Sequence, residues 1–244
     1  MVGSFFKVSE GVLKLKTDFS EINMNALELT GQSRTHIIQC EHPEFEAQPD
    51  VVDAFLQMRK AAKESGFDLY PVSAFRDFER QLCIWNLKFN GQRPLYSAEG
   101  NPIDISGLAD IEIVKQILIW SALPGASRHH WGTDIDVADL NAVPENYSIR
   151  LSIEETCEGG IFFPLHCWLD KNIHQFGFFR PYTDSQKGVS PEPWHLSFAP
   201  AAKMAMVKLD IDLLRSTIQN CQISGKAAIL DLLGYIYDEY VLIE

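Results

Sequence analysis

Two short segments of this sequence concentrate side chains that can bind a metal ion or transfer a proton. The first, Ser127-Arg-His-His-Trp-Gly-Thr-Asp-Ile-Asp136, contains two histidines and two aspartates. The second, Pro191-Glu-Pro-Trp-His195, adds a glutamate and a third histidine. Because 58 residues separate Asp136 from His195 (positions 137 to 194), the chain has room for a helix and a returning strand that bring the two segments together.

Zinc chemistry accounts for these residue types. A catalytic zinc site takes three protein ligands, usually imidazole nitrogens and carboxylate oxygens, and keeps one position for water. The metal lowers the pKa of that water to about 7, and a nearby carboxylate transfers the water's proton to the leaving amine. Two histidines, an aspartate and a glutamate meet this requirement. Asp134 and Asp136 lie on the same side of a strand, so one can bind the metal while the other sits at the rim or behind the ligands.

The order and spacing of these residues resemble a known family. Ser127-x-His129-x-x-Gly132-x-x-x-Asp136, followed by Glu192-x-Trp194-His195, is similar to the motifs of the zinc D-alanyl-D-alanine carboxypeptidases of the VanY type, in the LAS group of metallopeptidases. Upstream, Ser73-Ala-Phe-Arg76-Asp-Phe-Glu-Arg-Gln81 resembles the arginine segment of that family. Phe176-Gly-Phe-Phe-Arg180 resembles the segment before its last motif. The resemblance covers about residues 50–200, with the motifs in the family's order.

The resemblance implies a reaction and the residues that carry it. It implies that one zinc ion per chain is bound by His129, Asp136 and His195, with Glu192 as the catalytic acid and base. Arg76 is the second catalytic residue and is expected to bind the substrate carbonyl or the oxyanion that develops from it. The implied reaction is hydrolysis of the C-terminal D-amino acid of a peptidoglycan-type peptide by zinc-activated water.

Four further residues are expected at the substrate site. The resemblance implies that Ser127 and Gln81 contact the peptide end, and we expect Trp194 to form a pocket wall. Asp134 stands where the family usually has a small residue, often alanine, and a carboxylate there would raise the pKa of the zinc-bound water or change which substrate end is accepted. A second departure is Ser197, where the family often has arginine.

Three other interpretations of the same residues stay open. A zinc endopeptidase, amidase or dipeptidase on the same fold would differ only in the position of the scissile bond. A non-catalytic zinc-binding module would commonly lose the general base, whereas this chain retains Glu192 and Arg76. A serine hydrolase using Ser127 would leave Glu192 and His195 unexplained. The sequence contains no HExxH helix, P-loop or G-x-S-x-G elbow.

Other side chains of ligand type are interpreted as structural. His130 neighbours the expected ligand His129, but the motif favours His129. We expect Asp139 to cap a turn and Trp131 to form a pocket wall or core. The remaining histidines have no ligand partner at useful spacing; they are His36, His42, His166 and His174. The cysteines contain no CxxC pair and are interpreted as free thiols; they are Cys40, Cys83, Cys157, Cys167 and Cys221.

The elements that would position these motifs alternate between helices and short strands. Helices are predicted over about 50–66, 77–90, 108–123, 164–177 and from about 200 onward. Strands are predicted over 11–15, 69–73, 134–140, 178–182 and 194–198, with loops at 91–104 and 126–133. This order predicts an α+β fold, a small, mainly antiparallel sheet flanked by helices. The resemblance implies the LAS or hedgehog-like zinc peptidase version, as a single domain over 1–244 whose helical part after about 200 is a C-terminal extension.

Composition limits the partners and the compartment. The formal net charge is -12 and the basic residues are scattered, so nucleic acid is not an expected partner. Membrane insertion is also not expected, because no apolar stretch approaches the length of a spanning helix. The expected partner is a short peptide or muropeptide. The start of the sequence has no signal-peptide pattern, so we expect a cytoplasmic protein, or one of the periplasm or cell envelope if the N-terminus is truncated.

Overall fold

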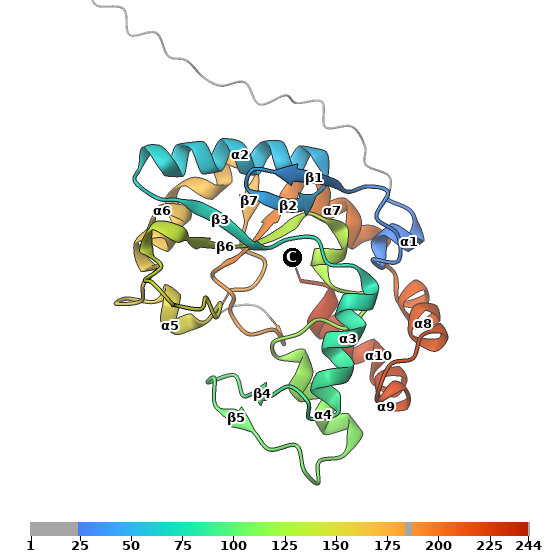
Figure 1. The fold of residues 1–244 in the computed structure, drawn as a ribbon. Helices are drawn as coiled ribbons and strands as arrows, with labels where there is room; N and C mark the ends of the chain where they lie inside the picture. Colours follow the sequence, from blue (N-terminus) through green and yellow to red (C-terminus); the bar gives the residue numbers. More distant parts are fainter. Residues whose placement is uncertain (1–23, 184–186, 244) are drawn as a thin grey trace, which may run out of the picture.

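A four-stranded antiparallel sheet lies at the centre of the computed structural model, which describes residues 24–183 and 187–243 (Figure 1). The strand order is β3-β6-β8-β7, and each neighbouring pair is antiparallel. The α+β fold with a small antiparallel sheet is therefore confirmed, whereas the strand predicted at 11–15 lies outside the described residues. The strands are β3 (Leu69–Ser73), β6 (Asp134–Asp139), β7 (Phe178–Phe179) and β8 (His195–Phe198).

Side chains alternate along the two central strands and give the sheet two different faces. Ile135 and Val137 of β6 point to one side with Leu196 of β8, and all three are 0% exposed. Helices α2 (Pro49–Glu64) and α6 (Phe163–Asn172) cover this side, and Figure 1 shows α2 running along the sheet. We call this cluster the sheet core; its main members are Val51, Phe55, Met58, Leu69, Ile135, Val137, Leu165, Leu169, Phe178, Leu196 and Phe198.

A second, separate cluster is built from helices. We call it the helical core, and it contains Trp85, Ile117, Leu214 and Ile229, each 0% exposed. Asp77 starts the first of these helices by accepting a hydrogen bond from the backbone N–H of Arg80, which satisfies a free amide of the first turn. The helices are α3 (Phe78–Phe89), α4 (Asp110–Leu118), α7 (Ala199–Lys208), α8 (Ile211–Asn220), α9 (Lys226–Asp231) and α10 (Leu233–Ile236).

Several predicted boundaries are corrected by the structure. The predicted strand at 178–182 ends at Phe179, because the chain then reaches Pro181, which has no N–H for a ladder. The polar loop predicted at 126–133 contains a buried turn, η1 (Arg128–Trp131). The loop predicted at 91–104 contains a short hairpin, β4 and β5. Short elements beyond the predicted ones are α1 (Ala26–Leu29), β1 (Ile38–Glu41), β2 (Glu44–Ala47), β4 (Leu95–Tyr96), β5 (Pro102–Ile103), η2 (Leu140–Ala142), α5 (Ile153–Thr156), η3 (Ile173–Phe176) and η4 (Tyr237–Val241).

Within the described ranges, no helix is both long enough and apolar enough to cross a membrane. All five cysteines are free thiols.

Candidate active site

The polar face of the sheet carries two of the three expected metal ligands. Asp136 of β6 and His195 of β8 are directly opposite each other in the antiparallel register. Both side chains point away from the sheet core, because their neighbours Ile135 and Leu196 point into it. The third ligand, His129, comes from η1, which precedes β6. Gly132 joins turn and strand with φ +65°, a conformation that glycine adopts without strain.

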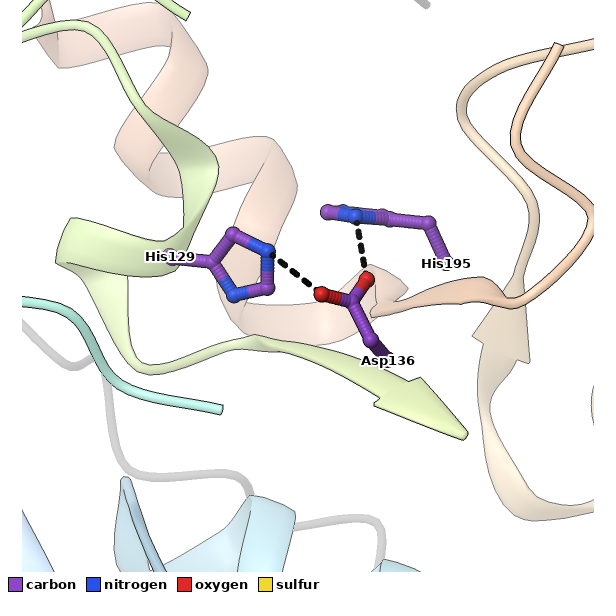
Figure 2. Close-up of side chains that lie close together, drawn as sticks. All are labelled: His129, Asp136 and His195. Carbon is purple, nitrogen blue, oxygen red and sulfur yellow. Dashed lines mark ion pairs between the residues drawn. The ribbon is translucent and has the colours of Figure 1, made fainter. Parts of the chain in front are cut away.

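The three side chains converge closely (Figure 2). Nε2 of His129 lies 3.3 Å from Oδ2 of Asp136, and Nδ1 of His195 lies 3.0 Å from Oδ1 of Asp136. One ligand atom of each residue lies within 4.8 Å of the others, and the residues are 6%, 5% and 2% exposed for His129, Asp136 and His195. The predicted trio is thus brought together in a buried site.

The second nitrogen of each ligand histidine is held by a hydrogen bond. Nδ1 of His129 lies 2.8 Å from the carbonyl oxygen of Ala74, to which it donates. Nε2 of His195 lies 2.9 Å from Oδ1 of Asp134 and donates to that carboxylate. These bonds leave Nε2 of His129 and Nδ1 of His195 facing Asp136, so the two rings offer different nitrogens to the site.

Electrostatics at the trio favour a bound cation. Burial alone would raise the pKa of Asp136, but the imidazoles of His129 and His195 hold it well below its usual range. Burial lowers the pKa of His129. Burial also disfavours a charged His195, yet the flanking carboxylates of Asp134 and Asp136 outweigh it and raise the pKa of His195 to about 10. A positive charge is therefore stabilised where Nδ1 of His195 meets Asp136.

One carboxylate oxygen in the trio lacks a hydrogen-bond donor. Oδ1 of Asp136 is buried and makes no hydrogen bond of good geometry; its neighbour is Nδ1 of His195, an ion-pair contact 3.0 Å away. Buried carboxylate oxygens are normally satisfied, so an unpaired one calls for a partner. Two imidazole nitrogens and a carboxylate oxygen form the donor set that catalytic zinc uses, and a cation bound among them would satisfy Oδ1.

Glu192 stands beside the trio at the edge of a cavity of about 670 Å³. Its Oε2 lies 3.5 Å from Nδ1 of His195, and its backbone N–H donates to the carbonyl of Tyr182. Burial raises the pKa of Glu192 to about 7, and the nearby negative charge of Asp136 adds to the rise. A carboxyl group with this pKa can both accept and donate a proton near neutrality.

Arg76 lines the same cavity and is held from behind. Its Nη1 donates to Oε1 of Gln81 at 2.9 Å, and its Nη2 donates to Oγ of Ser73 at 3.2 Å. Among the described residues no ion pair joins Arg76 to Asp77 or to Glu79 on the following helix, so the alternative of a simple surface pair is not observed. Arg76 is therefore directed toward the cavity.

The structure differs from the prediction for two of the four expected substrate contacts. Ser127 and Trp194 line the cavity, and their contact with substrate stays a prediction. Gln81 does not, because it is 0% exposed and lies behind Arg76, where its Nε2 donates to the carbonyl of Ala122. Asp134 is also 0% exposed and lies behind His195. Both side chains support residues of the site and do not touch the cavity.

The residues interpreted as structural lie outside the trio. His130 has both ring nitrogens bonded to backbone, since Nδ1 donates to the carbonyl of Arg76 and Nε2 accepts from the N–H of Gly125. Trp131 is 0% exposed and belongs to the helical core. Asp139 caps the end of β6 by accepting from the N–H of Asn141. His36, His42, His166 and His174 are outside the grouped ligands.

Further residues near the site were not predicted, among them Lys88, Tyr182 and Tyr240. Lys88 lies on the same side of α3 as Gln81, two turns later, and its Nζ donates to Oγ of Ser121 on the cavity wall. The seven-residue spacing was a usable signal for this position. Tyr182 and Tyr240 also line the cavity. Tyr240 lies on η4, and no local pattern marks it.

Comparisons with known proteins agree with this geometry. A family model described as VanY, D-alanyl-D-alanine carboxypeptidase, matches residues 44–201. An uncharacterized protein of Haemophilus influenzae is 34% identical over 122 residues, which cover 49% of this chain and 93% of that protein. A D-alanyl-D-alanine carboxypeptidase of Enterococcus faecalis is 29% identical over 144 residues, 57% of this chain and 42% of the relative.

A solved structure supports the fold assignment. VanYB in complex with D-alanine-D-alanine aligns with a TM-score of 0.51 and 21% identity, covering 78% of this chain and 92% of that one. The matched family segment contains every predicted site residue from Arg76 to His195. Helices α8, α9 and α10 lie beyond it.

Proposed function

Because this chain belongs to the VanY family of D-alanyl-D-alanine carboxypeptidases, we propose that it hydrolyses the C-terminal D-amino acid of peptidoglycan-type peptides with the help of one zinc ion. The observation that carries the proposal is the convergence of His129, Asp136 and His195 on the floor of a cavity that also contains Glu192. The carboxyl group of Glu192 beside the trio favours an enzyme over a binding module, because the reaction needs a proton-transfer group there.

The donor set fits zinc. His129 would bind through Nε2 and His195 through Nδ1, since their other nitrogens are occupied by Ala74 and Asp134. Asp136 would bind through the carboxylate that already faces both rings. Bound there, zinc would supply Lewis acidity that activates water at neutral pH and polarises a carbonyl group.

Glu192 is the proton-transfer group of the proposed reaction. Its carboxyl group lines the cavity within 3.5 Å of a ligand nitrogen, so it can reach a water molecule held beside the ligands. It would accept a proton from the attacking water and deliver it to the nitrogen of the leaving amino acid. A pKa of about 7 suits both steps, because proton transfer is most effective when the catalytic pKa is near the working pH.

Arg76 and Ser127 are the proposed contacts to the reacting end of the peptide. A guanidinium group can hold a carbonyl or carboxylate oxygen with two parallel hydrogen bonds. Two hydrogen bonds already fix the guanidinium of Arg76 on the side away from the cavity. The side chain therefore does not have to reorganise when the substrate binds. Ser127 and Trp194 would complete the wall around this end.

The decisive experiment compares substrates. Zinc-loaded protein is incubated with a short peptide ending in D-Ala-D-Ala as the free acid and with its C-terminal amide, and products are identified by mass spectrometry. We expect cleavage of the acid alone. Equal cleavage of both would replace the carboxypeptidase with an endopeptidase or amidase and leave the zinc site intact. A matched peptide with an L,D terminal bond tests the stereochemistry in the same assay.

A second measurement separates binding from chemistry. Glu192→Gln keeps the size of the side chain and removes the proton acceptor, so the protein should keep its zinc while turnover falls roughly 10²–10⁴-fold. Parental turnover of this variant would refute the role of Glu192. Glu158→Gln, on an exposed carboxylate, is the control and should behave as the parent.

A further inference from the structure

Asp134 occupies a position in the site that neither a ligand nor a substrate contact explains. It is 0% exposed and does not line the cavity. Its Oδ1 accepts from Nε2 of His195 at 2.9 Å and from Nε of Arg128 at 3.0 Å, and its Oδ2 accepts from the hydroxyl of Thr133. Both carboxylate oxygens are thus already occupied by protein donors.

The contact to His195 decides which ring nitrogen faces the metal site. A neutral imidazole has one N–H and one lone pair, and a hydrogen bond at one nitrogen fixes which form is present. Since Nε2 keeps its proton against Asp134, Nδ1 is the nitrogen that would exchange its proton for a metal ion, and it lies 3.0 Å from Oδ1 of Asp136. His129 is held differently, because its Nδ1 donates to an uncharged backbone carbonyl.

Arg128 allows the carboxylate of Asp134 to be buried. A carboxylate cannot be buried without a paired charge or several hydrogen bonds. Arg128 is 4% exposed. Its guanidinium donates from Nη2 to Oγ of Ser197 at 2.7 Å and lies over the rings of Trp131 and Phe179, 5.0 and 5.6 Å from the ring centroids. Its place is fixed on three sides, so the ion pair with Asp134 is fixed as well.

The register of the sheet explains how these residues meet. Asp134 of β6 is directly opposite Ser197 of β8, on the same face as the neighbouring pair of Asp136 and His195. The small side chain of Ser197 leaves room for the guanidinium of Arg128. Arg128 donates to both residues of this pair and so joins positions 134 and 197.

We propose that Asp134 is a positioning residue that holds His195 with Nδ1 toward the metal, and that Arg128 and Ser197 hold Asp134 in place. The inference rests on the proposed zinc site and deepens it. Carboxylates that hold a ligand histidine typically strengthen metal binding 10- to 100-fold. The role acts through metal affinity and ring orientation, and Asp134 itself touches neither substrate nor metal.

The test measures zinc affinity directly. Purified full-length parent and the Asp134→Ala and Asp134→Asn variants are titrated with zinc in competition with a chromophoric chelator. We expect Asp134→Ala to bind zinc roughly 10- to 100-fold more weakly and Asp134→Asn, which keeps an acceptor for Nε2, to lie between it and the parent. Asp139→Asn changes another buried carboxylate of the same strand and should keep the parental affinity.

A spectroscopic measurement separates positioning from a general loss of stability. Two-dimensional proton–nitrogen NMR of the imidazoles identifies the protonated and the metal-bound nitrogen of His195. We expect protonated Nε2 and metal-bound Nδ1 in the parent, and a mixture of ring states in the variants. If Asp134→Ala does not fold, Asp134→Asn carries the test, because its side chain has the same shape.

The outcomes distinguish the two proposals. Parental zinc affinity and a parental His195 ring state in the variants would overturn the positioning role while leaving the zinc site standing. A parent that binds no zinc would overturn the proposed function, and the positioning role with it.

Discussion

Gln81 offers the sharpest test of how the fold prepares Arg76 for substrate. The side chain of Gln81 accepts from Nη1 of Arg76 at 2.9 Å and donates to the carbonyl of Ala122 at 2.7 Å, and it is 0% exposed. Leucine has a similar volume and supports neither bond. Gln81→Leu would therefore remove both bonds and leave only Ser73 to hold the guanidinium.

The size of the effect follows from these contacts. A hydrogen bond to a charged group contributes about 1.5–3 kcal/mol, and a neutral one about 0.5–1.5 kcal/mol. The buried N–H of Arg76 and the carbonyl of Ala122 would both lose their partner, so the unfolding free energy should fall by about 2–4.5 kcal/mol. A displacement of about 1 Å in a positioned group can cost roughly 100-fold in rate. We expect kcat/KM to fall roughly 10- to 100-fold.

The assay has three parts. Initial rates on a D-Ala-terminated peptide give kcat/KM, urea unfolding gives stability, and elemental analysis gives the zinc content. The zinc content should equal that of the parent, because Gln81 touches none of the ligands. Gln57→Leu, at an exposed position of α2, is the control and should change neither rate nor stability appreciably. Parental kcat/KM in Gln81→Leu would refute the view that Gln81 positions Arg76.

Three further predictions follow from single contacts. His129→Gln should lose zinc whereas His130→Gln should keep it at lower stability, as elemental analysis and thermal unfolding will show; equal zinc loss in both would contradict the assignment. Burial lowers the pKa of Lys88 from 10.5 to about 8 in the folded protein. The charged lysine therefore destabilises the folded state below pH 8, and this destabilisation disappears as the pH rises from about 8 toward 10.5. The Lys88→Met variant should therefore have a higher melting temperature than the parent at pH 7, and the difference should be smaller at pH 10. A difference that is equal at both pH values would contradict the lowered pKa of Lys88. Gly132→Ala should lower the unfolding free energy by about 1–3 kcal/mol, because φ is +65° and the new Cβ would meet Ile37, and an unchanged denaturation midpoint would exclude this strain.

Local sequence patterns were sufficient for the framework of the site. The alternation of Ile135 and Val137 with Asp134 and Asp136 predicts a strand with one apolar and one polar face, and β6 has both. The helix from Asp77 is predicted by its cap and its apolar spacing, and it places Gln81 one turn after Arg76. The metal trio also needed the order of the motifs, because no local rule pairs Asp136 with His195 across 58 residues.

The errors arise where long-range packing decides the role of a side chain. Gln81 was expected at the peptide end because of the resemblance, and Asp134 was expected at the rim of the site or behind the ligands. The burial of Asp134 depends on Arg128, an unassigned position inside the motif, and on the space left by Ser197 across the sheet. The direction of Gln81 depends on the carbonyl of Ala122, 41 residues away. Such contacts form only once distant segments pack together. Helix and strand propensities and the spacing of apolar residues therefore cannot predict them.

The three metal ligands are distributed over two separately packed parts of the molecule. His129 lies on η1, whose Trp131 is anchored in the helical core, whereas Asp136 and His195 lie on strands that form the sheet core. A cation held by all three would link the cores, so neither could open alone without breaking a metal bond. Amide hydrogen exchange should then show one shared opening event in the zinc-loaded protein and two independent events after chelation. The metal would thus govern folding cooperativity as well as chemistry.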